Sequence, residues 1–428
     1  MDKLQRPFGF WTATALVVGG MIGSGIFALP SQVAPFGWTG VVAWMAAIAG
    51  AMLLAWTLAG LAAARPDATG VVAICADALG PLAGVLVGWA YWVGVWSANA
   101  FIALTAARYL GYFWPALVAT PLTTVATAVV VIWAITLLNL DGARTAGRFQ
   151  VLTTALKLLP LAAIVVLLLG FTLAGGGQFR QEAHPAFEWS QLTPALTLVF
   201  FALVGFEGAS IAAERVRDPA RNVVRATLAG VALTGMLYII VCTGIVLAMP
   251  GAAIANANAP VALFVQTYWG EGAGLLVAAF AAIATIGCLN GWVLVQGEVP
   301  LGMARAGVLP RWIARTNRRD VPVAVILLSS TLATVLVLSN ANRATGALYD
   351  FMLRITTAAT LWLYLGACLS ALVLGVRRAA AGLGLAFGLW ALWGAGLEAV
   401  AWSVALMLTA LPLYWTTRRP LAFAPAEG

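Results

Sequence analysis

The sequence predicts an all-α membrane protein whose chain crosses the bilayer twelve times. Apolar residues make up 62% of the 428 residues and charged residues only 9%, whereas a soluble domain carries about 25% charged residues. Apolar runs that are long enough to cross a bilayer, for which a helix needs about 20 residues, recur along the whole chain. Basic residues gather in alternate connections between these runs. Lipid must therefore be the solvent of most of this chain.

Short polar connections separate the twelve predicted spans. The spans cover approximately residues 9–34, 38–64, 81–112, 120–140, 149–174, 190–213, 222–249, 271–299, 321–339, 345–376, 379–397 and 398–417. No connection between them is long enough to hold a soluble domain, which needs about 50 residues. The first apolar stretch is also far longer than the apolar region of a cleavable signal peptide, so we expect none.

The distribution of Lys and Arg predicts the orientation. If the N-terminus lies in the cytoplasm, eighteen of the 23 basic residues fall in inside loops, and only Arg108, Arg180 and Arg343 fall in outside loops. This asymmetry follows the positive-inside rule, and removing one span would scramble it. We therefore expect an integral, multi-pass protein of the cytoplasmic (inner) membrane with both termini in the cytoplasm. The net charge of +8 does not indicate nucleic-acid binding, because the charge is spread over these loops.

Cysteine and histidine give no pattern of a metal or redox site. Cys75, Cys242, Cys288 and Cys368 lie far apart, in or near apolar runs, and His184 is the single histidine. We expect buried, inert thiols, no bound metal and no cofactor. The sequence also contains no nucleophile–base set and no phosphate-binding loop, so we do not expect an enzyme.

Two spans contain glycine clusters that can interrupt a helix, at 19–25 (GGMIGSG) and at 205–208 (GFEG). Each glycine weakens a helix by about 1 kcal/mol relative to alanine, and broken backbone is tolerated in a membrane only where it is buried or lines a cavity. The alternative is close packing of helices through small residues. The breaks fall in spans one and six. These are the first spans of each half if residues 1–376 are a core of two five-helix units, 9–174 and 190–376, followed by two helices and a tail in 377–428. Paired breaks point to a transporter's binding site.

The interrupted helices offer receptors for both ends of an amino acid. Backbone N–H groups at the first break can hold a carboxylate, helped by a helix dipole, and carbonyl groups before the second can accept from an ammonium. The candidate residues are Ile22, Gly23, Ser24 and Gly25 at the first break and Phe201, Ala202 and Gly205 at the second. A site of this kind suits a zwitterion better than a sugar or a fatty acid.

Two charged residues lie inside apolar spans, where a charge is costly and usually functional. Glu207, beside the second break, can gate the site or carry a proton; alternatively, it caps the broken helix. Lys157, in span five, is one of only two lysines. We expect it to be a cation fixed beside the first break, in place of a sodium ion, that loads and unloads a proton. The alternative is that it snorkels to the interface.

Aromatic and polar residues in other spans are candidates for the cavity wall. Tyr91 in span three is a candidate, with Glu207 and Lys157, for gating and proton coupling. Asn99 also lies in span three, and Trp292 lies near the middle of span eight. Most membrane tryptophans lie at the interface or pack between helices, but one at mid-span can gate a cavity or stack on a cationic or planar side chain. Thr356 and Thr360 in span ten can complete the wall, or they can bond to their own helix backbone.

These motifs are similar to those of the amino acid–polyamine–organocation family. The similar segments are GGMIGSGIFALP at 19–30, YWVGVWSAN at 91–99, GARTAGRFQ at 142–150, VFFALVGFEGASIAAERVRDPARNV at 199–223 and NGWVLVQGEVPLGMARAGVLP at 290–310. The resemblance covers nearly the whole chain. It implies a LeuT-like fold of two inverted five-helix repeats with broken first and sixth spans, two further helices, and a substrate held between the broken spans.

Within that family, the motifs most resemble the arginine/agmatine exchanger branch. The resemblance implies that Ser24 and Gly25 meet the carboxylate and that Glu207 lies at the gate. It also implies that three side chains, those of Asn99, Trp292 and Thr356, face the substrate side chain. Phe201 stands where that branch has a tryptophan. Lys157 is instead similar to the proton-coupled and light-chain-like neutral amino acid transporters, which favours sodium independence and weakens arginine as the substrate.

We therefore expect a sodium-independent secondary transporter of amino acids that works by alternating access, as a proton symporter or an exchanger. The alternative is an antiporter of arginine, lysine or their amines. A sensor is less favoured because no output domain fits, and a channel because no ring of like residues forms a filter. Metal transport is not favoured, since the first break offers only Gly, Ser and Ile beside Met21. The expected partners are a small-molecule substrate, protons and lipid, with no nucleic acid, for a monomer or homodimer.

Overall fold

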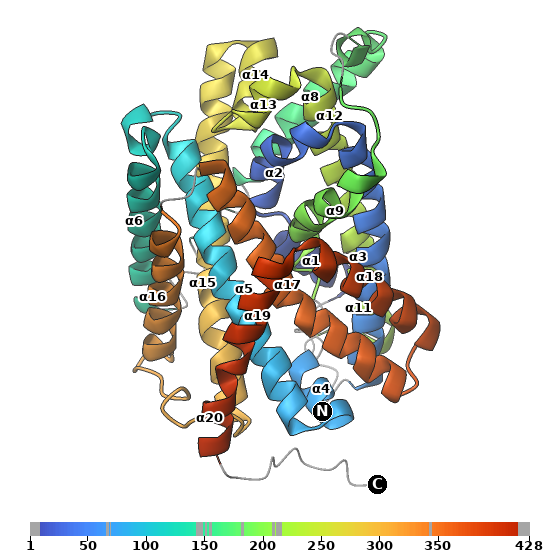
Figure 1. The fold of residues 1–428 in the computed structure, drawn as a ribbon, viewed down its shortest axis with the longest axis vertical. Coiled ribbons are helices and arrows are strands. Elements are labelled where there is room, and N and C mark those ends of the chain that lie inside the picture. The colour runs from blue at the N-terminus through green and yellow to red at the C-terminus, as the bar shows by residue number, and fades with distance from the viewer. Residues whose placement is uncertain are drawn as a thin grey trace.

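The computed structural model is a bundle of helices, many of them long (Figure 1). It describes residues 9–65, 68, 70–142, 149, 152–153, 156–180, 184–207, 210, 216–341 and 345–417. Seven helices in this part of the chain are long and apolar enough to cross a membrane, and a bent pair makes an eighth if it is counted as one span. The all-α membrane class is therefore confirmed, whereas the number of twelve spans stays a prediction.

The first half of the chain contains the bent pair and four further long or apolar helices. Its α-helices are α1 (Phe10–Met21), α2 (Gly25–Val33), α3 (Trp38–Ala64), α4 (Val71–Leu79), α5 (Pro81–Leu110), α6 (Pro121–Leu140) and α8 (Leu158–Leu173). Short 3₁₀ helices, η2 (Ala34–Phe36) and η3 (Pro115–Val118), follow α2 and α5. Proline at the first position of α5 and α6 fits because that position needs no N–H donor, and Gly80 before α5 has a φ of +95° that favours glycine.

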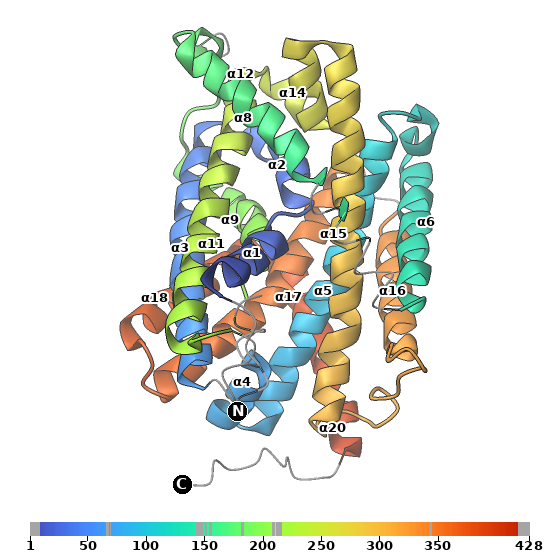
Figure 2. The same ribbon diagram turned by 180° about the vertical axis from the view of Figure 1, so that it is seen from behind.

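The second half begins with a short 3₁₀ helix and ends with three helices beyond the predicted core. Its elements are η4 (Gly177–Arg180), α9 (Trp189–Leu203), α11 (Pro219–Tyr238), the π-helical turn η6 (Ile239–Thr243), α12 (Gly244–Ala248), α13 (Gly251–Ala255), α14 (Pro260–Trp269), α15 (Glu271–Arg305), α16 (Val323–Ser339), α17 (Thr345–Val373), α18 (Arg378–Gly394), α19 (Leu397–Leu408) and α20 (Ala410–Thr416). The longest of these, α15, runs through much of the height of the bundle (Figure 2).

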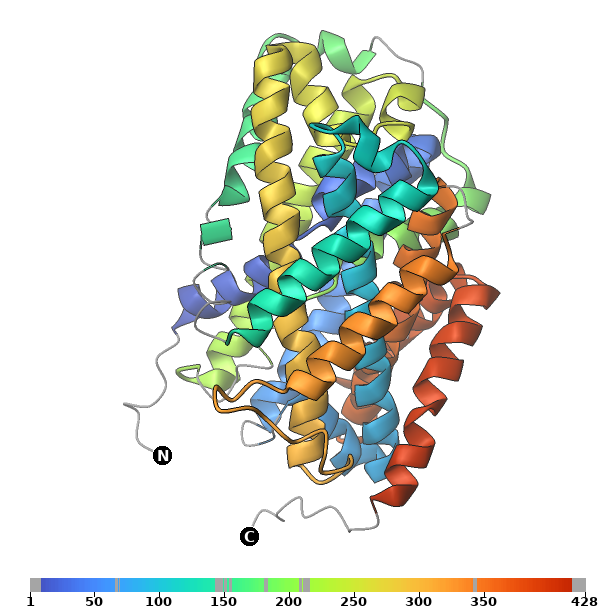
Figure 3. The ribbon, with the colours of Figure 1, turned by 90° about the vertical axis from the view of Figure 1, so that its left-hand side faces the viewer.

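Two groups of helices meet along α5 and α17. The helices α5, α6, α15 and α16 pack against one another, and α6 lies beside α16 at one side of the bundle (Figure 3). The helices α1, α3, α9 and α11 form a second packed group, which α18 covers from outside. Because α17 packs against both α5 and α9, it joins the two groups. The space where they meet is where the two glycine clusters lie.

The described residues contain the first predicted interruption and the start of the second. The helix α1 ends at Met21 and α2 begins at Gly25, with a bend of 46° between them. The helix α9 ends at Leu203 and is followed by a turn through Glu207, in which Gly205 has a φ of +110°. Most of the predicted continuation of this span, 208–213, lies outside the described residues. The glycine clusters therefore predicted where each helix stops.

Candidate functional site

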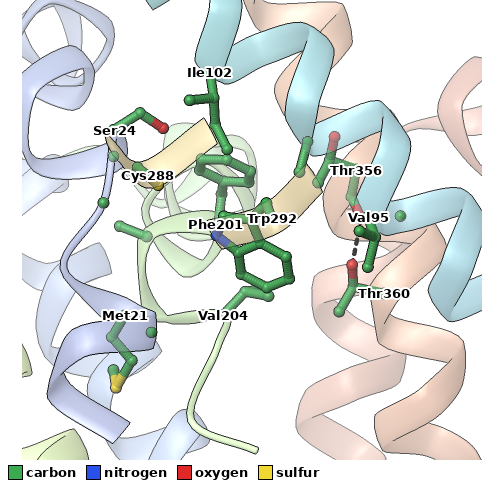
Figure 4. Close-up of a pocket in the computed structure, with 16 residues that line it drawn as sticks. Met21, Ser24, Val95, Ile102, Phe201, Val204, Cys288, Trp292, Thr356 and Thr360 are labelled. Carbon is green, nitrogen blue, oxygen red and sulfur yellow. Dashed lines mark hydrogen bonds between the residues drawn. The ribbon is translucent and has the colours of Figure 1, made fainter. Parts of the chain in front are cut away.

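A small cavity of about 30 Å³ lies where the two breaks meet α5, α15 and α17. It is lined by Gly20, Met21, Gly23, Ser24, Gly25, Gly94, Val95, Ala98, Ile102, Phe201, Ala202, Val204, Cys288, Trp292, Thr356 and Thr360. Figure 4 shows the rings of Phe201 and Trp292 between the first break on one side and the threonines of α17 on the other. Seven predicted substrate residues line this central cavity: Gly23, Ser24, Gly25, Phe201, Ala202, Trp292 and Thr356.

Glycine lets the two broken segments touch through their backbones. A Cβ atom added at Gly205 would lie 2.8 Å from the Gly20 carbonyl oxygen, and one added at Gly20 would lie 2.9 Å from the Gly205 oxygen. A Cβ at Gly25 would lie 2.9 Å from the Ala202 Cβ. Real Cβ atoms do not approach other atoms this closely, so side chains here would push the segments apart. The glycines therefore lie at the ends of the helices and also allow close packing, so both roles considered for them from the sequence apply.

Lys157 is buried beside the first break, with 6% of its surface exposed. Its ammonium donates hydrogen bonds of 3.0 Å to the carbonyl oxygens of Gly19 and Ile22. Tyr238 adds a bond of 2.6 Å to the Met21 oxygen. The last carbonyls of a helix lack partners within it and carry the negative end of its dipole. The Lys157 side chain therefore does not snorkel to an interface but satisfies the end of α1.

Glu207 accepts three hydrogen bonds in the turn after α9. Its carboxylate oxygens accept from the Tyr91 hydroxyl at 2.7 Å, the Tyr364 hydroxyl at 2.9 Å and the Gly205 N–H at 3.2 Å. The ring of Phe206 stacks on Tyr364 with centroids 4.7 Å apart. Glu207 and Tyr91, which were both predicted to act in gating or proton coupling, are thus in direct contact.

Three predicted substrate residues do not line the central cavity: Ile22, Asn99 and Gly205. The prediction that Asn99 faces the substrate is not supported by its position, because its amide donates a 2.7 Å bond to Gln296 on α15. The carbonyl of Ile22 is occupied by Lys157, and Gly205 lies in the turn that Glu207 holds. In place of Asn99, the helix α5 turns apolar side chains toward the cavity.

Several cavity residues were missed in the sequence. Val95, Ala98 and Ile102 of α5 line it, and so does Cys288, which was expected to be buried and inert. Cys288 lies four residues before Trp292, and Tyr364 lies four residues after Thr360, which places each pair on one face of a helix. That spacing makes both residues candidates in the sequence, but it does not show which side chains they contact.

The two threonines of α17 differ in their bonding. Thr360 donates to the Thr356 carbonyl at 2.9 Å (Figure 4). This is the bond to its own helix backbone that the sequence offered as the alternative to a role in the cavity wall. The Thr356 hydroxyl is buried and has no hydrogen-bond partner among the described residues. Because an unsatisfied buried hydroxyl is costly, this oxygen is available for a ligand in the cavity.

A second cavity of about 380 Å³ lies on the far side of Glu207, toward the end of α15 that leads into the basic loop 306–322. Tyr91 and Glu207 line it. The central cavity is lined by a near neighbour of each residue of this group, Glu207 and its two tyrosines. Gly94 is three residues after Tyr91, Val204 is three residues before Glu207, and Thr360 is four residues before Tyr364. The carboxylate and its two tyrosines therefore lie between the two cavities.

Comparison with known proteins agrees with these features. The sequence matches the family described as amino acid permease over residues 8–420. A putative arginine/ornithine antiporter of Bacillus subtilis is 30% identical over 386 residues, which cover 83% of this chain and 81% of the relative. A cadaverine/lysine antiporter of Escherichia coli K12 is 28% identical, with 83% and 80% covered.

Among solved structures, a Na⁺-coupled sialic acid symporter in a substrate-bound outward-open state superposes with a TM-score of 0.56. The match covers 93% of this chain and 90% of that one at 11% identity, so it shows a similar fold alone. The family predicted from the motifs is confirmed by the sequence matches. The chain belongs to the amino acid permease family, within the amino acid–polyamine–organocation transporters, and is an integral, multi-pass membrane protein.

Proposed function

We propose that this protein exchanges amino acids, or the amines derived from them, across the cytoplasmic membrane without sodium. The observation that carries the proposal is the pair of bonds from the Lys157 ammonium to Gly19 and Ile22. A sodium ion bound at a broken helix would neutralise the same kind of carbonyl oxygens. A covalently attached cation does so permanently, and the ion gradient is then not needed to complete the site.

The substrate is proposed to bind between the two breaks. The N–H groups at Ser24 and Gly25 would hold its carboxylate, and carbonyls near Phe201 and Ala202 would accept from its ammonium. A cavity of about 30 Å³ has room for about two water molecules. An amino acid therefore needs the broken helices to move away from α5 and α17, which is the motion that alternating access requires. Glu207 and its tyrosines would gate the path to the second cavity.

Cationic amino acids and their amines are the second candidate substrate class. The printed functions of the relatives, arginine/ornithine and cadaverine/lysine exchange, support it. No carboxylate lines the central cavity among the described residues. A cationic side chain would therefore be held by the face of Trp292 and the free hydroxyl of Thr356. Neutral amino acids fit the apolar wall of α5 equally well.

The proposal includes the arrangement that the sequence predicted. Residues 1–376 would form two inverted five-helix repeats, with 377–428 as an addition, and both termini would lie in the cytoplasm. The basic loop 306–322 and the second cavity next to it would then face the cytoplasm. The protein would act as a monomer or homodimer.

Uptake by purified protein in liposomes tests the proposal. Labelled alanine, leucine, lysine and arginine are offered without sodium to empty liposomes and to liposomes preloaded with the same compound. If the protein is an exchanger, labelled compound should enter preloaded liposomes but not empty ones. Uptake into empty liposomes driven by an inside-alkaline gradient would show proton symport instead. Uptake that depends on sodium, or no uptake by a protein that is folded, would refute the proposal.

A further inference from the structure

The second cavity has the size and walls of a binding site in its own right. Its volume of about 380 Å³ falls in the range of small-molecule sites, roughly 300–1,000 Å³. Its walls come from α4, α5, α15 and α17, and most of the lining is apolar. The apolar lining residues include Val71, Val72, Val85, Val295, Val299, Met303 and Leu363. We call it the α4 cavity.

The charges that line the α4 cavity are all negative. Glu207 and Glu298 line it, and no Lys, Arg or His does so in the described part of the chain. The Glu207 oxygens are occupied by Tyr91, Tyr364 and Gly205. Glu298 is exposed and has no hydrogen bond or ion pair with any residue that the structure describes. One carboxylate at this cavity is therefore available to a ligand.

The nearest cation along α15 acts on Glu298 through its charge but forms its ion pair with another residue. Arg305 lies seven residues beyond Glu298, two helical turns away, and donates to Asp320 at 3.1 Å. The loop that follows α15 is rich in exposed arginines, namely Arg311, Arg315, Arg318 and Arg319. Such a loop repels a free cation at this face. A carboxylate without a partner inside the mouth of the cavity counteracts that repulsion.

We propose that the α4 cavity binds an organic cation with an apolar chain and that Glu298 holds the ammonium. The methylene chain of such a ligand would cover the apolar walls, and its charge would pair with the Glu298 carboxylate at the mouth of the cavity. The inference rests on the proposed transport function. It assigns to that function an entry site for cations on the face of α4, before they pass Glu207.

The geometry of α15 provides a matched control. Glu271 begins this 35-residue helix, and at 1.5 Å per residue it lies about 40 Å from Glu298 along the axis. That distance exceeds the hydrocarbon core of a bilayer, about 30 Å. The two carboxylates therefore lie toward opposite faces. E271Q and E298Q each remove one negative charge from the same helix, but only E298Q removes it from the α4 cavity.

Transport kinetics from each face separate the two variants. Right-side-out and inside-out vesicles give the KM of cadaverine and of leucine for the wild type, E298Q and E271Q. E298Q should raise the KM of cadaverine by about fivefold on the α4 face and leave the other face and leucine unchanged. E271Q should match the wild type on the α4 face. Equal KM values for E298Q and the wild type, or an equal rise for leucine, would overturn the inference.

Binding to purified protein separates this inference from the transport proposal. Cadaverine should raise the Tm of the wild type and of E271Q by more than it raises that of E298Q, which lacks the carboxylate of the α4 cavity, whether or not the protein transports anything. If the protein transports leucine but its Tm does not respond to cadaverine, the proposed function stands and the proposed cation site is refuted. If the protein transports nothing but shows the Glu298-dependent rise in Tm, the proposed cation site stands and the proposed function is refuted.

Discussion

Lys157 donates a 3.0 Å hydrogen bond to the carbonyl oxygen of Ile22, the residue that directly follows the first helix. Residues 135 positions apart in the chain thereby meet at the break that lines the central cavity. The bond links span five to the segment that must move during transport, so it gives the first test of the proposed mechanism.

Replacing Lys157 with Ala should impair transport while the protein still folds. The variant leaves the carbonyls of Gly19 and Ile22 without their partner, which should lower the free energy of unfolding by about 1–3 kcal/mol. Sodium-independent uptake should fall by on the order of tenfold, equivalent to about 1.4 kcal/mol. Uptake and thermal denaturation are measured together, with K157M as a variant of similar length and no charge. Near-normal uptake by both variants would rule out this role.

Replacing Glu207 with Gln should slow exchange more than replacing Tyr364 with Phe. The carboxylate accepts from three donors, whereas the Gln amide turns an N–H₂ group toward one of them. Y364F removes a single hydrogen bond, worth about 1 kcal/mol, and leaves the other two. Exchange rates at saturating substrate compare the two variants. A rate for E207Q above that of Y364F would contradict the gate.

Replacing Gly205 with Ala should destabilise the protein. The φ of +110° at this position and the 2.8 Å approach of a new Cβ to the Gly20 oxygen should together cost about 1–3 kcal/mol. G170A is the control, because Gly170 lies inside α8 with open space around it, and alanine there should stabilise the helix by about 1 kcal/mol. Thermal denaturation in detergent measures both. Equal stability of the two variants would refute the close approach.

A small thiol reagent should inhibit transport through Cys288. This cysteine lines the central cavity and is partly exposed, while Cys75, Cys242 and Cys368 are buried. Saturating substrate should protect the thiol, because both occupy the same space. The C288S variant should keep its transport and resist the reagent. Inhibition of C288S to the same extent, or labelling that substrate does not slow, would count against the assigned cavity.

The sequence determined the class of the protein and the positions at which two of its helices, α1 and α9, stop. Its apolar runs predicted membrane helices, and its two glycine clusters predicted the ends of α1 and α9, because helix formation and helix interruption depend on neighbouring residues. Lys157 and Glu207 could be singled out for the same kind of reason, since a charge inside an apolar run is costly wherever the run lies in the fold.

Only the tertiary structure decided which side chains meet. The sequence placed Asn99 on α5 but did not reveal that its amide turns to Gln296 while Val95 and Ile102 face the cavity. Nor did it reveal that Tyr364 joins Glu207, or that Cys288 lines the site. The rotation of each helix about its axis is set by long-range packing against its neighbours. That packing is a property of the whole bundle, and no local pattern contains it.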